Sequence, residues 1–228
     1  GKIVSSTITK LNAPLAQAFD SQSSSDMIPT PTSNTLDQRL ADFATLTDAL
    51  EYAAQGTTGF NFYDARGNLR SVLAYRTLRD NARKIAQRLS GIGLVQGDRV
   101  AIIADTSPEF VELFFACRYI GLVPFAMPVP VNLGSHGVYV QQLRGMLEGS
   151  QASIALANVD YFNFLEEASE EVSDLKWIGT PEQLNQLPAQ DVVLKSNHPD
   201  ETAYIQFTSG STRMPRGVVI TERALMCN

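Results

Sequence analysis

The residues best suited to chemistry lie near the end of the chain, in the stretch QFTSGSTRMPRG at residues 206–217. Serine and threonine hydroxyls can donate hydrogen bonds, and the planar guanidinium groups of arginine suit phosphate oxygens. Glycine lets the backbone approach a ligand closely. The candidate anion-binding residues are Thr208, Ser209, Gly210, Ser211, Thr212, Arg213, Arg216 and Gly217. We refer to residues 208–217 as the hydroxyl-rich loop, and the combination predicts that it binds a phosphate group.

The segments on either side of this loop are strand patterns, ETAYIQF before it and GVVIT after it. A Walker loop would read G-x-x-x-x-G-K-[ST] and pass directly into a helix, and neither condition is met here. Because a loop between strands has no helix dipole, it must offer backbone N–H groups, hydroxyls and cationic side chains. The shorter run SGST is ordinary hairpin or linker chemistry, so only the whole twelve-residue pattern favours anion binding.

A second glycine-rich stretch, GIGLVQG at residues 91–97, comes close to a dinucleotide fingerprint. Gln96 stands where the third glycine belongs, and the stretch follows a helical pattern although the fingerprint must follow a strand. We interpret it as the end of a helix followed by a loop.

The rest of the chain from about Leu40 has the pattern of an α/β domain. Segment 59–75 predicts two short strands around a turn at 66–68. An amphipathic helix follows and ends near Gly91, with its apolar face formed by Leu78, Ala82, Ile85 and Leu89. The further predicted elements are a buried strand over 98–104, a helix from an N-cap at Ser107 through Ile120, a strand over 122–129, a helix near 137–149, a strand over 152–157 and an acidic, solvated helix over 160–175. This alternation predicts a mainly parallel sheet flanked by helices.

Residues 1–37 are rich in Ser, Thr, Pro and Asn and lack apolar periodicity. We predict that they form an N-terminal extension and that residues 38–228 form the globular domain.

Composition excludes several classes of protein. The chain has 228 residues, is 44% hydrophobic and carries a net charge of −6, so a nucleic-acid binder is not expected. The longest uncharged apolar run, 119–131, is too short for a membrane span and is interrupted by prolines.

Cys117 and Cys227 are typical of reduced cysteines, which predicts a cytoplasmic protein. His136 and His198 fall in predicted loops and receive no role, and no spacing predicts a metal site.

The stretch YIQFTSGSTRMPRGV resembles the phosphate-binding signature of the adenylate-forming superfamily, which includes acyl-CoA synthetases, fatty acyl-AMP ligases and peptide-synthetase adenylation domains. The family pattern is roughly [Y/F]-T-S-G-[S/T]-T-G-x-P-K-G, with Arg213 here at the usual glycine and Arg216 at the usual lysine. Arginine at the first point, after Gln206, is similar to the fatty acyl-AMP ligase branch. After the motif the family often shows Ser/Thr-His, whereas Thr221 is followed here by Glu222. Upstream, GIGLVQGDRVAIIA and EFVELFFAC also resemble the family, so the resemblance covers about residue 40 to the end.

The resemblance implies a ligase that uses ATP and Mg²⁺. In the family, a carboxylate attacks the α-phosphate of ATP to give an acyl-adenylate and pyrophosphate, while the loop holds the β- and γ-phosphates. The matched Ser and Thr residues would donate to those oxygens, Gly210 and Gly217 would let the loop close, and Arg216 would supply the cation. Arg213 is a weaker candidate than Arg216, because an exposed loop arginine is the ordinary alternative.

The family's other motifs, for adenine, ribose and Mg²⁺ and for the catalytic lysine, lie beyond this loop. The chain is therefore expected to be the N-terminal portion of an adenylation domain, inactive alone and without a catalytic residue or a protein ligand for Mg²⁺. The implied partners are a carboxylic acid, a fatty acid in the branch named above, and an acyl carrier protein or CoA as acceptor. The alternatives are an acyl-CoA ligase, a non-catalytic binding module that keeps the fold, and an unrelated phosphate-binding protein.

Overall fold

The computed structural model describes residues 36–37, 40, 42–130, 136–194, 197–208 and 216–227. The elements are α1 (Leu46–Ala53), β1 (Gly59–Tyr63), β2 (Leu69–Ala74), α2 (Tyr75–Gly91), β3 (Arg99–Ile103), α3 (Pro108–Tyr119), β4 (Val123–Met127), α4 (His136–Ser150), β5 (Ala152–Leu156), α5 (Val159–Ser169), β6 (Trp177–Gly179), α6 (Pro181–Gln186), β7 (Thr202–Thr208), β8 (Arg216–Thr221) and α7 (Glu222–Met226). Residues 1–35 lie outside this description, so the predicted boundary between extension and domain at residue 37 stays a prediction.

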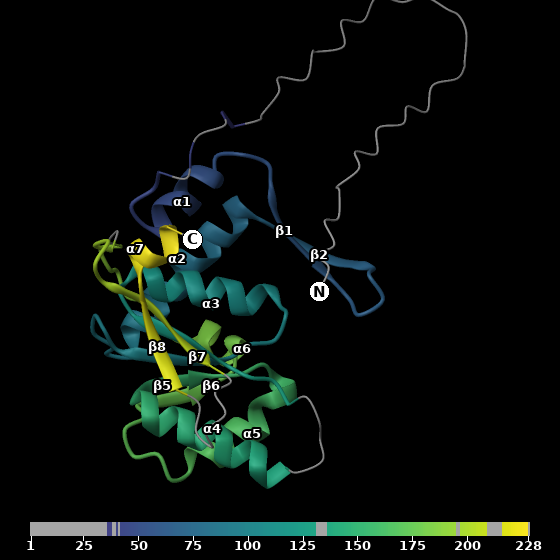
Figure 1. The fold of residues 1–228 in the computed structure, drawn as a ribbon, viewed down its shortest axis with the longest axis vertical. Helices are drawn as coiled ribbons and strands as arrows, with labels where there is room; N and C mark the ends of the chain where they lie inside the picture. The colour runs from purple at the N-terminus through teal and green to yellow at the C-terminus, as the bar shows by residue number, and fades with distance from the viewer. Residues whose placement is uncertain are drawn as a thin grey trace, which may run out of the picture. The chain divides into compact units, whose positions relative to one another are not determined.

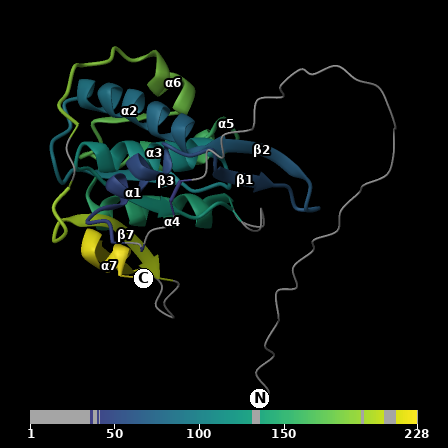
Figure 2. The same cartoon turned by 90° about the horizontal axis from the view of Figure 1, so that it is seen from above.

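The main sheet confirms the predicted fold class. Its six strands follow the order β6-β5-β3-β4-β7-β8, and every neighbouring pair is parallel except β7 with β8. Helices cover both faces, with α2 and α3 on one and α4 and α5 on the other (Figure 1). Helix α6 lies beside α2, where Arg88 Nε donates to Asn185 O at 3.0 Å (Figure 2).

Two apolar cores form because side chains alternate across the central strand β3. Val100 and Ile102 face the core that includes the apolar stripe of α2. Ala101 and Ile103 face the core beneath α4 and α5. Since both faces of β3 are buried, its sequence is continuously apolar, as is typical of parallel sheets.

Helix α3 begins where the sequence predicts. The side chain of Ser107 caps it by accepting from Phe110 N at 3.3 Å, and Pro108 occupies its first turn. The predicted hairpin is also present, with β1 and β2 antiparallel and Gly67 at φ +81° in the turn between them. This φ lies in the left-handed region, which glycine adopts without strain and residues with a side chain rarely adopt.

Helix α5 is shorter than the predicted 160–175 pattern, because it ends at Ser169. Glu170 and Glu171 would meet the negative end of the helix dipole, and the following Ser173 and Asp174 favour turns over helix. His136 begins α4, so its predicted placement in a loop is wrong. Over the described residues, no helix is both long enough and apolar enough to cross a membrane.

Candidate functional site

The hydroxyl-rich loop lies between two strands, β7 and β8, as the sequence predicts, and these strands are hydrogen-bonded to each other and antiparallel. The last pair in their register is Thr208 with Arg216, and Thr208 Oγ1 donates to Arg216 O at 3.4 Å. Thr208 and Arg216, which carry the first hydroxyl and the last cation of the motif, are therefore neighbours where the hairpin opens. Ser209, Gly210, Ser211, Thr212 and Arg213 lie outside the described residues.

The parallel sheet determines which edge the loop occupies. Strand β7 is parallel to β4, with Phe125 opposite Ile205. Thr208 is thus at the carboxyl end of a parallel strand, the edge at which open α/β sheets bind ligands.

Gly217 is required by close packing within the hairpin. A Cβ atom built on Gly217 would lie 2.8 Å from Ile205 Cγ2 and 3.6 Å from ring atoms of Phe207. Phe207 itself packs edge-on against Phe125 of β4, with ring centroids 5.5 Å apart. The last glycine of the motif therefore lets β8 lie against the apolar side chains that join β7 to the sheet.

Arg216 is available to an anion. It is exposed, and it forms no ion pair within the described part of the chain. An exposed guanidinium beside a threonine hydroxyl can bind a phosphate oxygen through charge-assisted hydrogen bonds.

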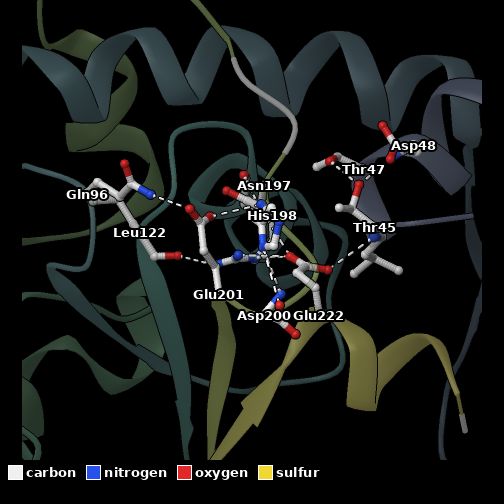
Figure 3. Close-up of polar contacts among 12 residues, drawn as sticks. Thr45, Thr47, Asp48, Gln96, Leu122, Asn197, His198, Asp200, Glu201 and Glu222 are labelled. Carbon is white, nitrogen blue, oxygen red and sulfur yellow. Dashed lines mark hydrogen bonds and ion pairs between the residues drawn. The ribbon is translucent and has the colours of Figure 1, made fainter.

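The other end of the hairpin rests on a buried ionic cluster that the sequence did not reveal. Glu222, the first residue of α7, is fully buried and pairs with Arg118 of α3, Nη2 to Oε1 at 2.8 Å. Asn197 Nδ2 donates to the same Oε1 at 3.2 Å, and Leu46 N donates to Oε2 at 3.2 Å (Figure 3). The one sequence signal was the acidic residue after Thr221 where the family pattern often has histidine.

The second glycine-rich stretch is the end of a helix, as interpreted. Helix α2 ends at Gly91, and the next glycines, Gly93 and Gly97, have φ of +80° and +89° in the turns that lead to β3. These conformations suit glycine and mark chain reversal.

Cys117 is a core residue and not a reactive thiol. It is completely buried in α3, and burial raises the pKa of its thiol to about 12. Because the thiolate is the reactive form, this side chain is inert near neutral pH.

A hollow at the amino ends of β4 and β7 carries no comparable signal. Gln96, Gly121 and Thr202 contribute to its lining. Its acidic side chains already have partners, since Glu201 accepts from Gln96 Nε2 at 2.8 Å and Asp200 accepts from Arg223 Nη2 at 2.8 Å. We assign it no role.

Comparison with known proteins agrees with the motif. The family model described as AMP-binding enzyme matches residues 51–228. A Caulobacter vibrioides protein named "Putative acyl-CoA synthetase" is 40% identical over 87% of this chain and 34% of its own length. The Moorena producens medium-chain-fatty-acid–[acyl-carrier-protein] ligase JamA is 29% identical over 81% of this chain and 32% of its own.

Among solved structures, one from a study of fatty acyl-adenylate ligases of E. coli and L. pneumophila superposes with a TM-score of 0.79 and 42% identity. The match covers 83% of this chain and 34% of that one. The chain thus spans about a third of the length of the relatives it matches.

Proposed function

Because the chain belongs to the AMP-binding enzyme family, we propose that it is part of an ATP-dependent ligase that converts a carboxylic acid, specifically a fatty acid, to its acyl-adenylate. A carboxylate oxygen of the acid bonds to the α-phosphorus of ATP, the bond between the α-phosphorus and the bridging oxygen to the β-phosphorus breaks, and pyrophosphate leaves. The acyl group then passes to a carrier protein or to CoA. The proposed location is the cytoplasm, where ATP and both acceptors are present.

One observation carries the proposal: the hairpin pairs Thr208 with Arg216 at the carboxyl end of a parallel strand, and the side chain of Arg216 is exposed and forms no ion pair with the described residues. In this role, Arg216 binds the β- and γ-phosphates and offsets the negative charge that rises on them as they leave. The matched hydroxyls of Ser209, Ser211 and Thr212 add donors, Gly210 and Gly217 let the backbone approach, and Arg213 supplies a second cation.

Mg²⁺ accompanies ATP in this proposal as a counter-charge on the phosphates. Over the described residues, no group of three or more His, Cys, Asp or Glu side chains gathers as a metal site. In this proposal the nucleotide carries the metal, and no step is assigned to a metal ligand of this chain.

The acceptor separates two candidate functions. JamA, by its name, acts with an acyl carrier protein, and the solved structure at 42% identity comes from work on fatty acyl-adenylate ligases. These favour a carrier protein. The Caulobacter relative is named as a synthetase of acyl-CoA, which favours CoA as the second candidate.

The test is pyrophosphate exchange by the complete polypeptide with Mg-ATP and a panel of fatty acids, followed by addition of CoA. We expect exchange with at least one fatty acid and no thioester with CoA. A thioester on adding CoA would identify a CoA ligase. Absence of exchange with every acid would refute the proposal and leave a binding module that keeps the fold.

Variants at Arg216 test the site itself. Arg216→Met removes a charge-assisted contact worth about 1.5–3 kcal/mol, so the KM for ATP should rise about 10- to 100-fold. Arg216→Lys keeps the positive charge but loses the planar fork of the guanidinium. Its KM for ATP should lie between the values of the wild type and of Arg216→Met. Arg223→Met is the matched control, since Arg223 is exposed on α7 and pairs with Asp200 at the far end of the hairpin.

A further inference from the structure

The segment that follows the hydroxyl-rich loop is held to the domain at a single buried point. Strand β8 is an edge strand in which Val218 and Val219 are exposed, at 44% and 59%, and Ile220 is half-buried. Among residues 216–227, all of them described, only Glu222 is buried. The one side chain of this segment that is fully buried is therefore a carboxylate, while its apolar residues are half-buried or exposed.

The carboxylate of Glu222 draws three separate segments together. Arg118 donates to Oε1 through Nε at 3.0 Å and through Nη2 at 2.8 Å. Asn197 Nδ2 donates to the same oxygen and also to Arg118 O, the latter at 2.7 Å. The backbone N–H of Leu46, in the first turn of α1, donates to Oε2. These contacts join the end of α3, the start of α1 and the start of α7, and Figure 3 shows Asn197 beside Glu222 among them.

Because the ion pair of Arg118 and Glu222 is buried, it is stable only in a narrow range of geometries. The side chains of Arg118 and Glu222 are both fully buried, and Arg118 Nη1 also donates to Leu122 O. A buried charge without its partner is strongly unfavourable, so the start of α7 is stable only where its carboxylate meets the guanidinium. The pair therefore fixes one position for α7, where apolar contacts could tolerate several.

The hydrogen bonds between β7 and β8 connect the position of α7 to the hydroxyl-rich loop. Glu222 N donates to Glu201 O at 3.0 Å, and the next pair along the ladder is Thr202 with Thr221. A register irregularity follows between Thr202 and Tyr204, and from the pair of Tyr204 with Ile220 the ladder continues to Thr208 and Arg216. The whole span is about 20 Å at the usual rise of a strand. Because a shift of one residue would turn every side chain of β8 to the other face, the anchored end determines the face on which Arg216 emerges.

We propose that Glu222 is a positioning residue for the hydroxyl-rich loop: through Arg118 and Asn197 it fixes the register of β8 and so the place of Arg216. The inference rests on the proposed function in one respect, that the loop binds the phosphates of ATP. It also gives a reason for the departure from the Ser/Thr-His pattern, since a buried carboxylate after Thr221 needs the cation that Arg118 supplies.

The test uses Glu222→Gln in the complete polypeptide, with Arg223→Met as the control. In pyrophosphate exchange, Glu222→Gln should raise the KM for ATP at least about fivefold and leave the KM for the acid within about twofold. By hydrogen exchange with mass spectrometry, the amides of β8 should exchange at least about tenfold faster, while those of β5 keep their wild-type rates. The control should change neither readout, because its pair with Asp200 is largely exposed.

Each outcome decides the inference. Unchanged β8 amides, or β5 and β8 amides accelerated alike, would overturn it, because the carboxylate would then serve no local role. A KM for ATP that stays at the wild-type value while β8 loosens would also overturn it. If the wild-type polypeptide exchanges pyrophosphate with no acid, the proposed function fails, and the hydrogen-exchange arm still determines whether Glu222 fixes the hairpin.

Discussion

Replacing Arg118 with methionine should destabilise the domain strongly, because it removes one partner of the buried ion pair with Glu222. Methionine fills similar space without a charge, so the substitution removes both guanidinium contacts to Glu222 Oε1. The carboxylate keeps Asn197 Nδ2 and Leu46 N as donors, each at 3.2 Å. Leu122 O loses its donor as well.

The magnitude follows from leaving one buried charge unpaired. Removing one partner of a fully buried ion pair costs about 3–5 kcal/mol. Glu222→Gln should cost a similar amount, because it leaves the guanidinium of Arg118 unpaired instead. The double variant leaves neither charge behind, so its cost should fall short of the sum of the two single costs by about 2–3 kcal/mol.

The assay is native-state hydrogen exchange of the α3 amides in the complete polypeptide, which reports the local free energy of opening without assuming that a longer chain unfolds in one step. A matched cycle on the exposed pair of Asp200 and Arg223 provides the reference, and its coupling should be about 0–1 kcal/mol. Additivity of Arg118→Met and Glu222→Gln within about 0.5 kcal/mol would refute the reasoning, because the two charges would then not depend on each other.

Three further outcomes are expected. Gly217→Ala should destabilise the β7–β8 hairpin by about 1–3 kcal/mol, because the new Cβ would lie 2.8 Å from Ile205 Cγ2. Hydrogen exchange of the hairpin amides measures this, and adding Ile205→Ala should restore part of the stability that β8 loses. Alkylation with iodoacetamide below about pH 10 should modify Cys227, which is exposed, and spare Cys117, whose pKa is raised to about 12; peptide mass spectrometry separates the two. Ser107→Ala should lower the opening free energy of the first turn of α3 by about 1 kcal/mol, whereas Ser107→Thr, which keeps the hydroxyl that caps the helix and donates to Asp105, should not.

The parts of the fold that the sequence predicted are those set by local pattern. The stripe from Leu78 to Leu89 repeats at helical spacing, and all four of its residues are buried in α2. Ser107 and Pro108 mark the start of α3 through chemistry contained within one turn. Helices α1, α6 and α7 were not predicted; they span eight, six and five residues, too few for a clear period.

In the candidate site, too, the sequence predicted only what depends on neighbouring residues. The hydroxyls, glycines and cations of the loop are consecutive in sequence, so the motif could be read directly. The strands on either side of the loop were predicted, but their antiparallel pairing, which brings Thr208 opposite Arg216, was not. Whether Ser209, Gly210, Ser211, Thr212 and Arg213 bind phosphate stays a prediction, because they lie outside the described residues.

The anchor at Glu222 could not be predicted, for a physical reason. Arg118 and Glu222 are 104 residues apart, and Leu46 is 176 residues from Glu222. In the sequence, each of these charges looks like an ordinary polar residue at the end of a helical segment, and only the tertiary fold buries them against each other. A motif can state which groups bind a ligand, because those groups must be close together in any fold. The position of the motif depends on contacts between distant segments. A departure from the family pattern inside such a contact, such as the glutamate after Thr221, becomes interpretable only once its partner is known, and here that partner is Arg118.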